Sequence, residues 1–195
     1  QETIHRLEGE VTHTNTLIVT TEKQRDIVEW QLKEVVDSVN CVVEPEGRNT
    51  APAIALVTFK LFKQNKDSML LVLPSDHFIG DSEKFIAAVN SGAEVADKGR
   101  LVTFGIKPSR PETGYGYIKT GKKIKDNVFS VARFTEKPDY QTAKKMVDDG
   151  SFFWNSGMFL FRAKDMIAEF KTHMPEMYKL FMDNLKYFGT PDETV

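Results

Sequence analysis

The sequence predicts an α/β fold built on a mixed, mostly parallel β-sheet with helices on both faces. In the first half of the chain, apolar runs of strand length alternate with amphipathic stretches of helix length, as in parallel sheets with crossover helices. Short continuous apolar runs such as residues 70–73 fit strands buried on both sides. After Ile106, two apolar stretches flank the polar turn 120–127, which predicts an inserted antiparallel β pair.

Periodicity and turn residues predict the elements in order. The first half is predicted to hold strands at 17–19, 41–43, 69–73 and 101–106, with helices at 22–36, 52–63 and 82–96 between them. The second half is predicted to hold strands at 114–119, 128–134 and 152–161, and helices at 139–148, 164–173 and 175–186. Pro52 and Pro175 lie in the first turns of their helices, where a missing N–H is tolerated. Asp81 or Ser82 is the expected N-cap of the helix that follows.

Composition limits the class of protein. A chain of 195 residues with 41% hydrophobic content suits one soluble domain. The 26 basic and 28 acidic residues are spread along the chain, so we expect no nucleic-acid partner. No apolar run is long enough to span a bilayer and residues 1–10 lack the apolar stretch of a signal peptide, so we expect no membrane partner and a cytoplasmic location. The single Cys41 is expected to be a small buried apolar residue in a reducing compartment.

The polar turn 44–50 joins a strand to a helix and is the most informative segment. Gly47 permits a backbone conformation that other residues resist, and Asn49 or Thr50 can cap the helix. The Glu44 carboxylate can accept from both N1–H and N2–H of guanine while Arg48 or a backbone N–H serves O6, whereas adenine lacks that donor pair. The turn therefore predicts a guanine nucleotide site. The alternative is that Asn49 and Thr50 only cap the helix and Arg48 lies in solvent.

Asp76 follows the predicted strand 69–73 through Pro74, which places a carboxylate at the rim of the crevice where ligands of α/β sheets bind. Its position next to the nucleotide turn favours a Mg²⁺ ligand. The alternative is an aspartate that only caps a turn. His77 is expected to make a structural hydrogen bond, since the four histidines lack the spacing of a metal site.

Three further segments suit a sugar phosphate. Gly114 and Tyr115 lie at the start of the predicted antiparallel strand 114–119, where glycine lets a ligand approach the backbone, although a bulge would explain it equally well. Glu136 can accept from sugar hydroxyls while Lys137 neutralises a phosphate, the alternative being a solvated ion pair. Asn155 is a polar amide within an aromatic run, where it is costly unless partnered, and it suits vicinal hydroxyls.

Together these segments resemble the mannose-1-phosphate guanylyltransferases of the sugar-nucleotidyltransferase superfamily. The resemblance spans nearly the whole chain and is carried, in the family's order, by EPEGRNTAPAIAL (44–56), LVLPSDHFI (71–79), LVTFGIKPSRPETGYGYI (101–118), FTEKPD (134–139) and WNSGMFLFR (154–162). It implies a Rossmann-like, GT-A-like nucleotidyltransferase core in which GTP and mannose 1-phosphate give GDP-mannose and pyrophosphate with Mg²⁺. The roles it implies are guanosine binding by Glu44, Gly47, Arg48 and Asn49, metal binding by Asp76, sugar contacts by Gly114, Glu136 and Asn155, and a sugar-phosphate contact by Lys137.

The resemblance also implies segments that this sequence does not contain. Family members begin with a first strand and a glycine-rich loop, GxGxRxWPxSR followed by a Lys, and carry a second metal aspartate in a segment resembling SIDYAVMEK. We therefore expect residues 1–195 to form a partial nucleotidyltransferase domain that is inactive alone. The absent strand would be central, so exposed sheet edges would favour a homodimer. The alternatives are a related hexose-1-phosphate nucleotidyltransferase that uses another base or sugar, and a noncatalytic nucleotide-sugar-binding module.

Overall fold

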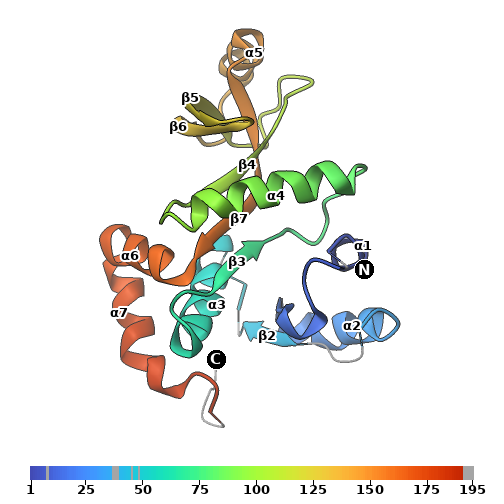
Figure 1. The fold of residues 1–195 in the computed structure, drawn as a ribbon, viewed down its shortest axis with the longest axis vertical. Coiled ribbons are helices and arrows are strands. Elements are labelled where there is room, and N and C mark those ends of the chain that lie inside the picture. Colours follow the sequence, from blue (N-terminus) through green and yellow to red (C-terminus); the bar gives the residue numbers. More distant parts are fainter. Residues whose placement is uncertain (8, 37–39, 45, 48, 191–195) are drawn as a thin grey trace.

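The computed structural model describes residues 1–7, 9–36, 40–44, 46–47 and 49–190, which form two β-sheets surrounded by helices (Figure 1). The smaller sheet pairs strand β1 (Ile18–Thr21) with β2 (Cys41–Glu44) in parallel. The larger sheet contains β3 (Met69–Val72), β4 (Val102–Ile106), β5 (Tyr117–Lys125), β6 (Val128–Thr135) and β7 (Phe152–Arg162). The α/β class and the antiparallel β5–β6 pair are confirmed.

Strand β7 is the centre of the larger sheet because three other strands pair with it, all antiparallel. β3 and β4 both pair with Phe159 and Leu160, so they lie on opposite edges of β7. This differs in detail from a mostly parallel sheet. β3 and β4 run in the same direction, as the alternating pattern predicts, but β7 returns from far along the chain and lies between them.

Seven α-helices are seen in the described residues, and most match the predicted bounds within two residues. They are α1 (Glu2–His5), α2 (Glu22–Leu32), α3 (Thr50–Gln64), α4 (Ser82–Ala96), α5 (Tyr140–Asp149), α6 (Ala163–His173) and α7 (Pro175–Asn184), with short 3₁₀ turns at His13–Asn15 and Leu185–Tyr187. Asp81 caps α4 as predicted, because its carboxylate accepts from the N–H of Lys84 at 3.0 Å. Helix α2 is shorter than expected and ends at Leu32.

Helices cover both faces of β7, and the alternation of its side chains decides which helix meets which residue. Leu160 faces α4, because a Cβ built on Gly92 of that helix would lie 3.3 Å from the Leu160 side chain. The opposite face carries Phe159 and Phe161, which pack with Ile54 and other residues of α3. The predicted cover on both faces is therefore confirmed.

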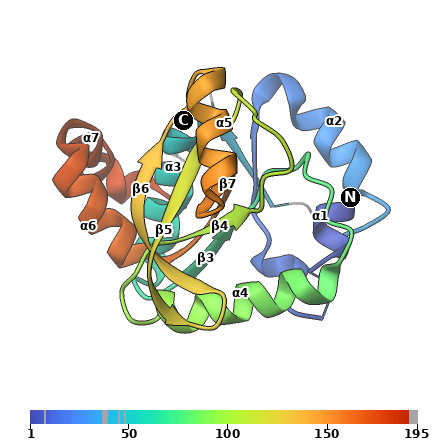
Figure 2. The same ribbon diagram turned by 90° about the horizontal axis from the view of Figure 1, so that it is seen from above.

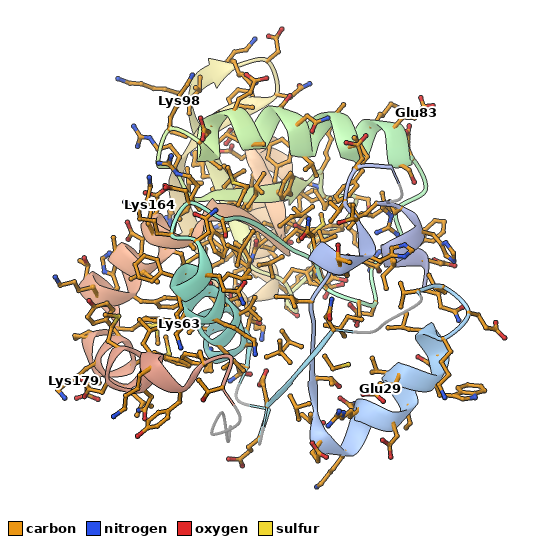
Figure 3. The ribbon with its side chains drawn as sticks, turned by 60° about the horizontal axis from the view of Figure 1, so that its bottom comes forward. Glu29, Lys63, Glu83, Lys98, Lys164 and Lys179 are labelled. Atoms are coloured by element: carbon orange, nitrogen blue, oxygen red, sulfur yellow. The ribbon has the colours of Figure 1, made fainter. Side chains whose placement is uncertain are left out.

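The largest apolar cluster lies between α3, α6 and α7 around Phe59, which is fully buried. The Phe59 ring stacks on Phe181 at 5.1 Å and on Phe170 at 6.3 Å between ring centroids. Lys63 of α3 donates to the carbonyls of Lys186 and Phe188 at 2.8 and 2.7 Å, which holds the segment after α7 against α3. Figure 3 shows Lys63 on this side of the molecule and Glu29 of α2 on the other.

A second apolar cluster seats α5 on the larger sheet through Tyr117, Ala143, Met146 and Phe152. Trp154, Tyr117 and Thr135 form one row across β7, β5 and β6, so their side chains share the face that α5 covers. The next residues along these strands point to the opposite face, which is also the face of Phe159 and α3. Figure 2 shows α6 and α7 on one side of the molecule and α1 and α2 on the opposite side.

Two expectations from composition concern membrane-spanning segments and the single cysteine. No helix in the described part of the chain is long and apolar enough to cross a membrane. Cys41 is only half-buried in β2, and partial burial raises the pKa of its thiol.

Candidate functional site

Asn155 lies at the centre of a cluster on the face of the larger sheet opposite α5. Its two cross-strand neighbours are glycines: it pairs with Gly105 of β4, and its N–H donates to the carbonyl of Gly116 at 2.7 Å. A Cβ on Gly105 would lie 2.7 Å from the Cβ of Phe153, and one on Gly116 would lie 2.8 Å from Cζ of Phe134. The absent side chains therefore let both aromatic rings lie across the neighbouring strands beside Asn155.

Glu136 joins this cluster from the end of β6. A Cβ on Gly116 would lie 2.9 Å from Oε2 of Glu136, so the carboxylate rests against the Gly116 backbone. Lys137 makes a 3.7 Å ion pair with Glu136, and the two side chains are 64% and 60% exposed. Lys137 also has a φ of 38°, a left-handed backbone angle that is uncommon for lysine. We call Gly105, Gly116, Glu136 and Asn155 the Asn155 cluster.

The loop before β5 holds Gly114 and Tyr115, and its described ring contact lies on the α5 face of the sheet rather than on the face of Asn155. The Glu112 carboxylate accepts from the N–H groups of Thr113 and Gly114 at 3.0 and 3.3 Å, and these bonds, that of Gly114 first, lower the pKa of Glu112. The Tyr115 ring meets Trp154 edge-on at 5.3 Å between centroids. Both predicted residues are exposed, and the Gly114 N–H is engaged by its own loop.

Asp76 lies beyond β3 in a segment held by the N-terminal part of the chain. The carbonyls on either side of it, those of Ser75 and His77, accept from Thr3 Oγ1 at 3.4 Å and from the Arg6 guanidinium at 3.2 Å. The Asp76 carboxylate is exposed and has no hydrogen-bond or ion-pair partner in the described part of the chain. His77 takes part in the bond with Arg6 through its backbone carbonyl, so the structural hydrogen bond expected of its side chain stays a prediction.

An open cavity of about 480 Å³ adjoins Asp76 between this segment, α1 and the end of α2. Two exposed aromatic residues, Trp30 and Phe78, are 71% and 82% exposed at its rim. The described residues contain no group of three or more His, Cys, Asp or Glu side chains close enough to hold a metal ion. The described residues around Asp76 therefore do not complete a metal site by themselves.

The turn 44–50 begins at Glu44, the last residue of β2, where partial burial raises the pKa of the carboxyl. Arg48 lies outside the described residues. The prediction for Gly47 was wrong in one respect: its backbone is not in the left-handed region, and a Cβ there would meet only Thr21 at an ordinary 3.7 Å. The strained residue is Asn49, with φ 71° and ψ −174°, a region that side chains strongly disfavour.

Asn49 is the N-cap residue of α3, but its side chain makes no capping hydrogen bond. Thr50 is the exposed first residue of the helix. The interpretation that Asn49 merely caps the helix therefore lacks its expected bond, although the residue occupies the expected position. Two of the three non-glycine residues with positive φ in the described chain, Asn49 and Lys137, are predicted site residues, and backbone strain concentrates at binding sites.

The described contacts connect the predicted residues unevenly. Glu136 and Asn155 both lie against Gly116, whereas the described ring contact of Tyr115 is with Trp154 on the opposite face of the sheet, and Gly114 contacts its own loop. The segment of Asp76 meets the same region through Pro74, whose Cγ lies 3.6 Å from a Cβ built on Gly157. The turn 44–50 relates to it only through α3, which packs on the face of β7 that carries Asn155. A single groove joining Glu44, Asp76, Glu136 and Asn155 remains a prediction.

Two residues near Asn155 were not predicted from the sequence. Thr103 donates to Oδ1 of Asn155 at 3.0 Å, and the buried Ser156 donates to the carbonyl of Phe104 at 2.6 Å. A threonine in a strand is ordinary, so no pattern singles out Thr103. A usable signal was that Thr103 is the one polar side chain in the predicted strand 101–106.

Comparison with known proteins agrees with these features. The family model described as nucleotidyl transferase matches residues 1–187. The mannose-1-phosphate guanylyltransferase RfbM of Salmonella typhimurium is 46% identical over 182 residues, which cover 92% of this chain and 38% of that protein. The chain thus spans well under half the length of the curated relatives that it matches.

Two solved structures share the fold. One, described as mannose-1-phosphate geranyltransferase from Thermus thermophilus, aligns with a TM-score of 0.86 and 32% identity over 98% of this chain and 55% of that one. The other, described as mannose-6-phosphate isomerase from Helicobacter pylori, aligns with a TM-score of 0.82 and 35% identity over 95% of this chain and 69% of that one. From its sequence and its fold, the chain belongs to the nucleotidyl transferase family.

Proposed function

We propose that this protein transfers GMP from GTP to mannose 1-phosphate, giving GDP-mannose and pyrophosphate in the cytoplasm. The observation that carries the proposal is the Asn155 cluster, where the strand of an amide residue and a carboxylate both lie against Gly116 on one face of the sheet. An amide and a carboxylate together offer hydrogen-bond donors and acceptors, which is what a sugar with several hydroxyls requires. Family membership and the named relatives support the choice of reaction.

For the nucleotide, we propose a site at the turn 44–50. Glu44 would accept from the two donors on the edge of guanine, and Gly47, Arg48, Asn49 and Thr50 would line the turn at the N-terminus of α3, where helix N–H groups attract anions. Two observations support this: the half-buried Glu44 lies at a strand end, and the Asn49 backbone is strained with no capping bond to explain it.

For the sugar phosphate, we propose that Glu136 and Asn155 contact hydroxyls and that Gly114 and Tyr115 border the ring. The ammonium of Lys137 would contact the phosphate, since it is largely exposed and its only described partner is Glu136. The left-handed backbone of Lys137 supports this role, because it turns the chain sharply at the point where the ion pair forms.

The reaction needs positioning more than acid–base chemistry. One oxygen of the sugar phosphate would bond to the α-phosphorus of GTP while the bond from that phosphorus to the bridging oxygen breaks and pyrophosphate leaves. A sugar phosphate has a second pKa of about 6, so its oxygen is already ionised at neutral pH. A general base is therefore unnecessary, and the residues of this chain would orient the two substrates and exclude water.

We further propose that Asp76 binds Mg²⁺. An exposed carboxylate without a described partner suits this hard cation, which commonly takes one or two carboxylates together with substrate phosphates. When bound, the ion would neutralise charge on the phosphate oxygens. Thr3 and Arg6 would hold the backbone on both sides of Asp76 in place for this role.

The test measures pyrophosphate release by the complete natural protein with mannose 1-phosphate, Mg²⁺ and one nucleotide at a time. GTP should be preferred over UTP, dTTP and ATP by at least about tenfold, since a half-buried acceptor for two donors disfavours bases that lack them. Glu44→Gln should reduce this preference, while Glu83→Gln on the exposed face of α4 should leave it unchanged. A preference for dTTP or UTP in the unmodified protein would contradict the proposed base.

The same assay on residues 1–195 alone addresses the noncatalytic alternative. We expect this chain to bind GDP-mannose in a calorimetric titration with Mg²⁺ but to release no pyrophosphate, because the resemblance assigns further phosphate-binding residues to other segments. A complete protein that binds GDP-mannose without turnover would favour the binding module. Sedimentation of the complete protein would test the proposed homodimer.

A further inference from the structure

We propose that Thr103 is a positioning residue that orients the Asn155 amide so that its N–H groups, rather than its oxygen, meet a ligand hydroxyl. This inference rests on the proposed function, because the ligand is the sugar of the nucleotide sugar. It adds a residue that neither the sequence pattern nor the family resemblance singled out. Its foundation is the set of hydrogen bonds that surrounds the amide.

Two donors converge on Oδ1 of Asn155. The Thr103 hydroxyl lies 3.0 Å from Oδ1, and the backbone N–H of Gly157 lies 3.3 Å from it. A backbone N–H can only donate, so the amide atom that faces Gly157 must be the oxygen. The orientation of the amide therefore follows from the hydrogen-bond network, which is how oxygen and nitrogen are told apart in such side chains.

The Thr103 hydroxyl also lies 3.2 Å from the carbonyl of Met158. Because a hydroxyl has a single hydrogen, it is shared between Oδ1 of Asn155 and this carbonyl, and both are acceptors. Thr103 thus ties the Asn155 side chain to the backbone three residues further along β7. Without the hydroxyl, the single long bond from Gly157 would remain to hold the amide oxygen.

The pairing of β4 with β7 around Thr103 explains why hydrogen-bond donors lie beside Oδ1 of Asn155. Thr103 pairs with Phe159 and Gly105 pairs with Asn155, so residues 156–158 of β7 bulge out of the ladder. Gly157 has a φ of 72° within this bulge, and Ser156 anchors it by donating to the Phe104 carbonyl and accepting from the Met158 N–H. The bulge turns the Gly157 N–H back toward the Asn155 side chain.

The nitrogen of the amide is left without a partner among the described residues. Nδ2 diverges from Oδ1 at the planar amide carbon, so it is directed away from Thr103 and Gly157. On the same face, Glu136 presents a carboxylate that can only accept. The cluster would therefore offer donors from Asn155 and acceptors from Glu136, so that one sugar hydroxyl accepts while another donates.

The experiment compares Thr103→Val, which removes the hydroxyl at nearly constant shape, with Thr103→Ser, which keeps it. The matched control is Thr58→Val, because Thr58 is fully buried in α3 and its hydroxyl has no partner among the described residues. Two measurements are made on each variant of the complete protein. The first is the affinity for GDP-mannose and for GDP. The second is the ¹H–¹⁵N signal pair of the Asn155 side-chain amide, which is identified by its loss in Asn155→Asp.

In Thr103→Val we expect the affinity for GDP-mannose to fall about tenfold, while the affinity for GDP changes less than twofold. Thr103→Ser and Thr58→Val should match the unmodified protein. The Asn155 amide should lose its restricted motion in Thr103→Val and keep it in Thr103→Ser. A purely structural role would weaken both ligands together and would not be rescued by serine.

Two results would overturn the inference: an Asn155 amide that is equally ordered in Thr103→Val, or equal losses of affinity for GDP and GDP-mannose. If the unmodified protein binds GDP but not GDP-mannose, the proposed function fails instead. The amide signals, recorded without ligand, then decide the role of Thr103 by themselves.

Discussion

The Asn155 cluster and the turn 44–50 are constructed by different means. The cluster is assembled from four strands, β4 to β7, whose residues are far apart in sequence and joined by ladder hydrogen bonds. The turn is a local segment between β2 and α3, and β2 pairs with one strand, β1, over four residues. Figure 1 places the β5–β6 hairpin and β2 toward opposite ends of the long axis.

This difference shows what fixes the side chains of each region before a ligand binds. In the cluster, side-chain positions follow from strand register, and a change at one residue is felt by its cross-strand neighbours. In the turn, positions follow from backbone angles, of which the Asn49 φ of 71° is the clearest. We therefore expect substitutions in the cluster to displace neighbouring side chains and substitutions in the turn to act locally.

The largest effect is expected at Asp76, which lies in a segment that contacts the region of Asn155 through Pro74 and Gly157. Asp76→Asn in the complete protein should lower Mg²⁺-dependent turnover by at least about 100-fold, because a metal-bound carboxylate supports several kcal/mol of charge stabilisation. Pyrophosphate release measures this. Asp126→Asn, at the exposed turn of the β5–β6 hairpin, is the control and should be neutral.

Binding of Mn²⁺ in place of Mg²⁺ gives an independent test, through paramagnetic broadening of NMR signals around residue 76. Asp76→Asn should remove that broadening. Unchanged turnover in the variant would exclude Asp76 from the metal site. The proposed link at Asp76 between the Asn155 cluster and the turn 44–50 would then be lost.

An effect of intermediate size is expected from two matched glycine substitutions, one in the Asn155 cluster and one in the turn 44–50. In Gly116→Ala the new Cβ would lie 2.8 Å from Phe134 Cζ and 2.9 Å from Glu136 Oε2, whereas in Gly47→Ala it would lie 3.7 Å from its nearest neighbour. Both contacts of Gly116 are the far ends of side chains, so the fold should tolerate the change while the carboxylate moves.

Calorimetry with GDP-mannose is the measurement for this pair. We expect Gly116→Ala to weaken binding about tenfold, which corresponds to about 1.4 kcal/mol, and Gly47→Ala to weaken it less, because its Cβ would meet no close contact. Equal effects of the two substitutions would contradict the contrast between a register-built cluster and a locally built turn.

The smallest effect concerns two carboxyl groups, one in the turn 44–50 and one in the loop before β5. Burial raises the pKa of Glu44 above its ordinary 4.5, and hydrogen bonds from Gly114 and Thr113 lower that of Glu112 below the same value. The contribution of Glu44 to stability is therefore present below pH 4.5 and lost as pH rises through its raised pKa. That of Glu112 is present above pH 4.5 and lost as pH falls through its lowered pKa.

Carboxyl ¹³C NMR titration of the unligated protein would follow both groups, with Glu44→Gln and Glu112→Gln to assign the signals. We expect two midpoints on opposite sides of pH 4.5. A Glu44 midpoint below that of Glu112 would mean that the strand end at Glu44 is hydrated, and the proposed guanine acceptor would then be weaker.

Much of the fold follows from local sequence. Helix α4 has the predicted bounds because a strong cap at Asp81 and a regular apolar period mark its start and length. The position of β7 between β3 and β4 could not be predicted, since periodicity shows that a segment is a strand but not which strands pair with it. Glu136 and Asn155 were predicted as site residues, whereas Gly105 and Gly116 were not. The contacts among these four residues depend on the pairing of β7.

The turn shows a different limit. Gly47 is the residue that tolerates unusual backbone angles best, yet the positive φ occurs at Asn49. Where a turn bends depends on how its two ends are held, here by β2 and α3, and composition alone does not determine that. Thr103 was missed because its importance arises from a bulge in the opposite strand.

The bulge at residues 156–158 has one more consequence. Side chains alternate along a strand, so sliding β7 by one position would turn Asn155 toward α5 and bring Trp154 to the exposed surface. The bulge fits the neighbouring strand β4 in one register only, so it prevents such sliding. Adding or deleting one residue between Asn155 and Phe159 should therefore exchange the faces on which Trp154 and Asn155 lie, while leaving the helices intact.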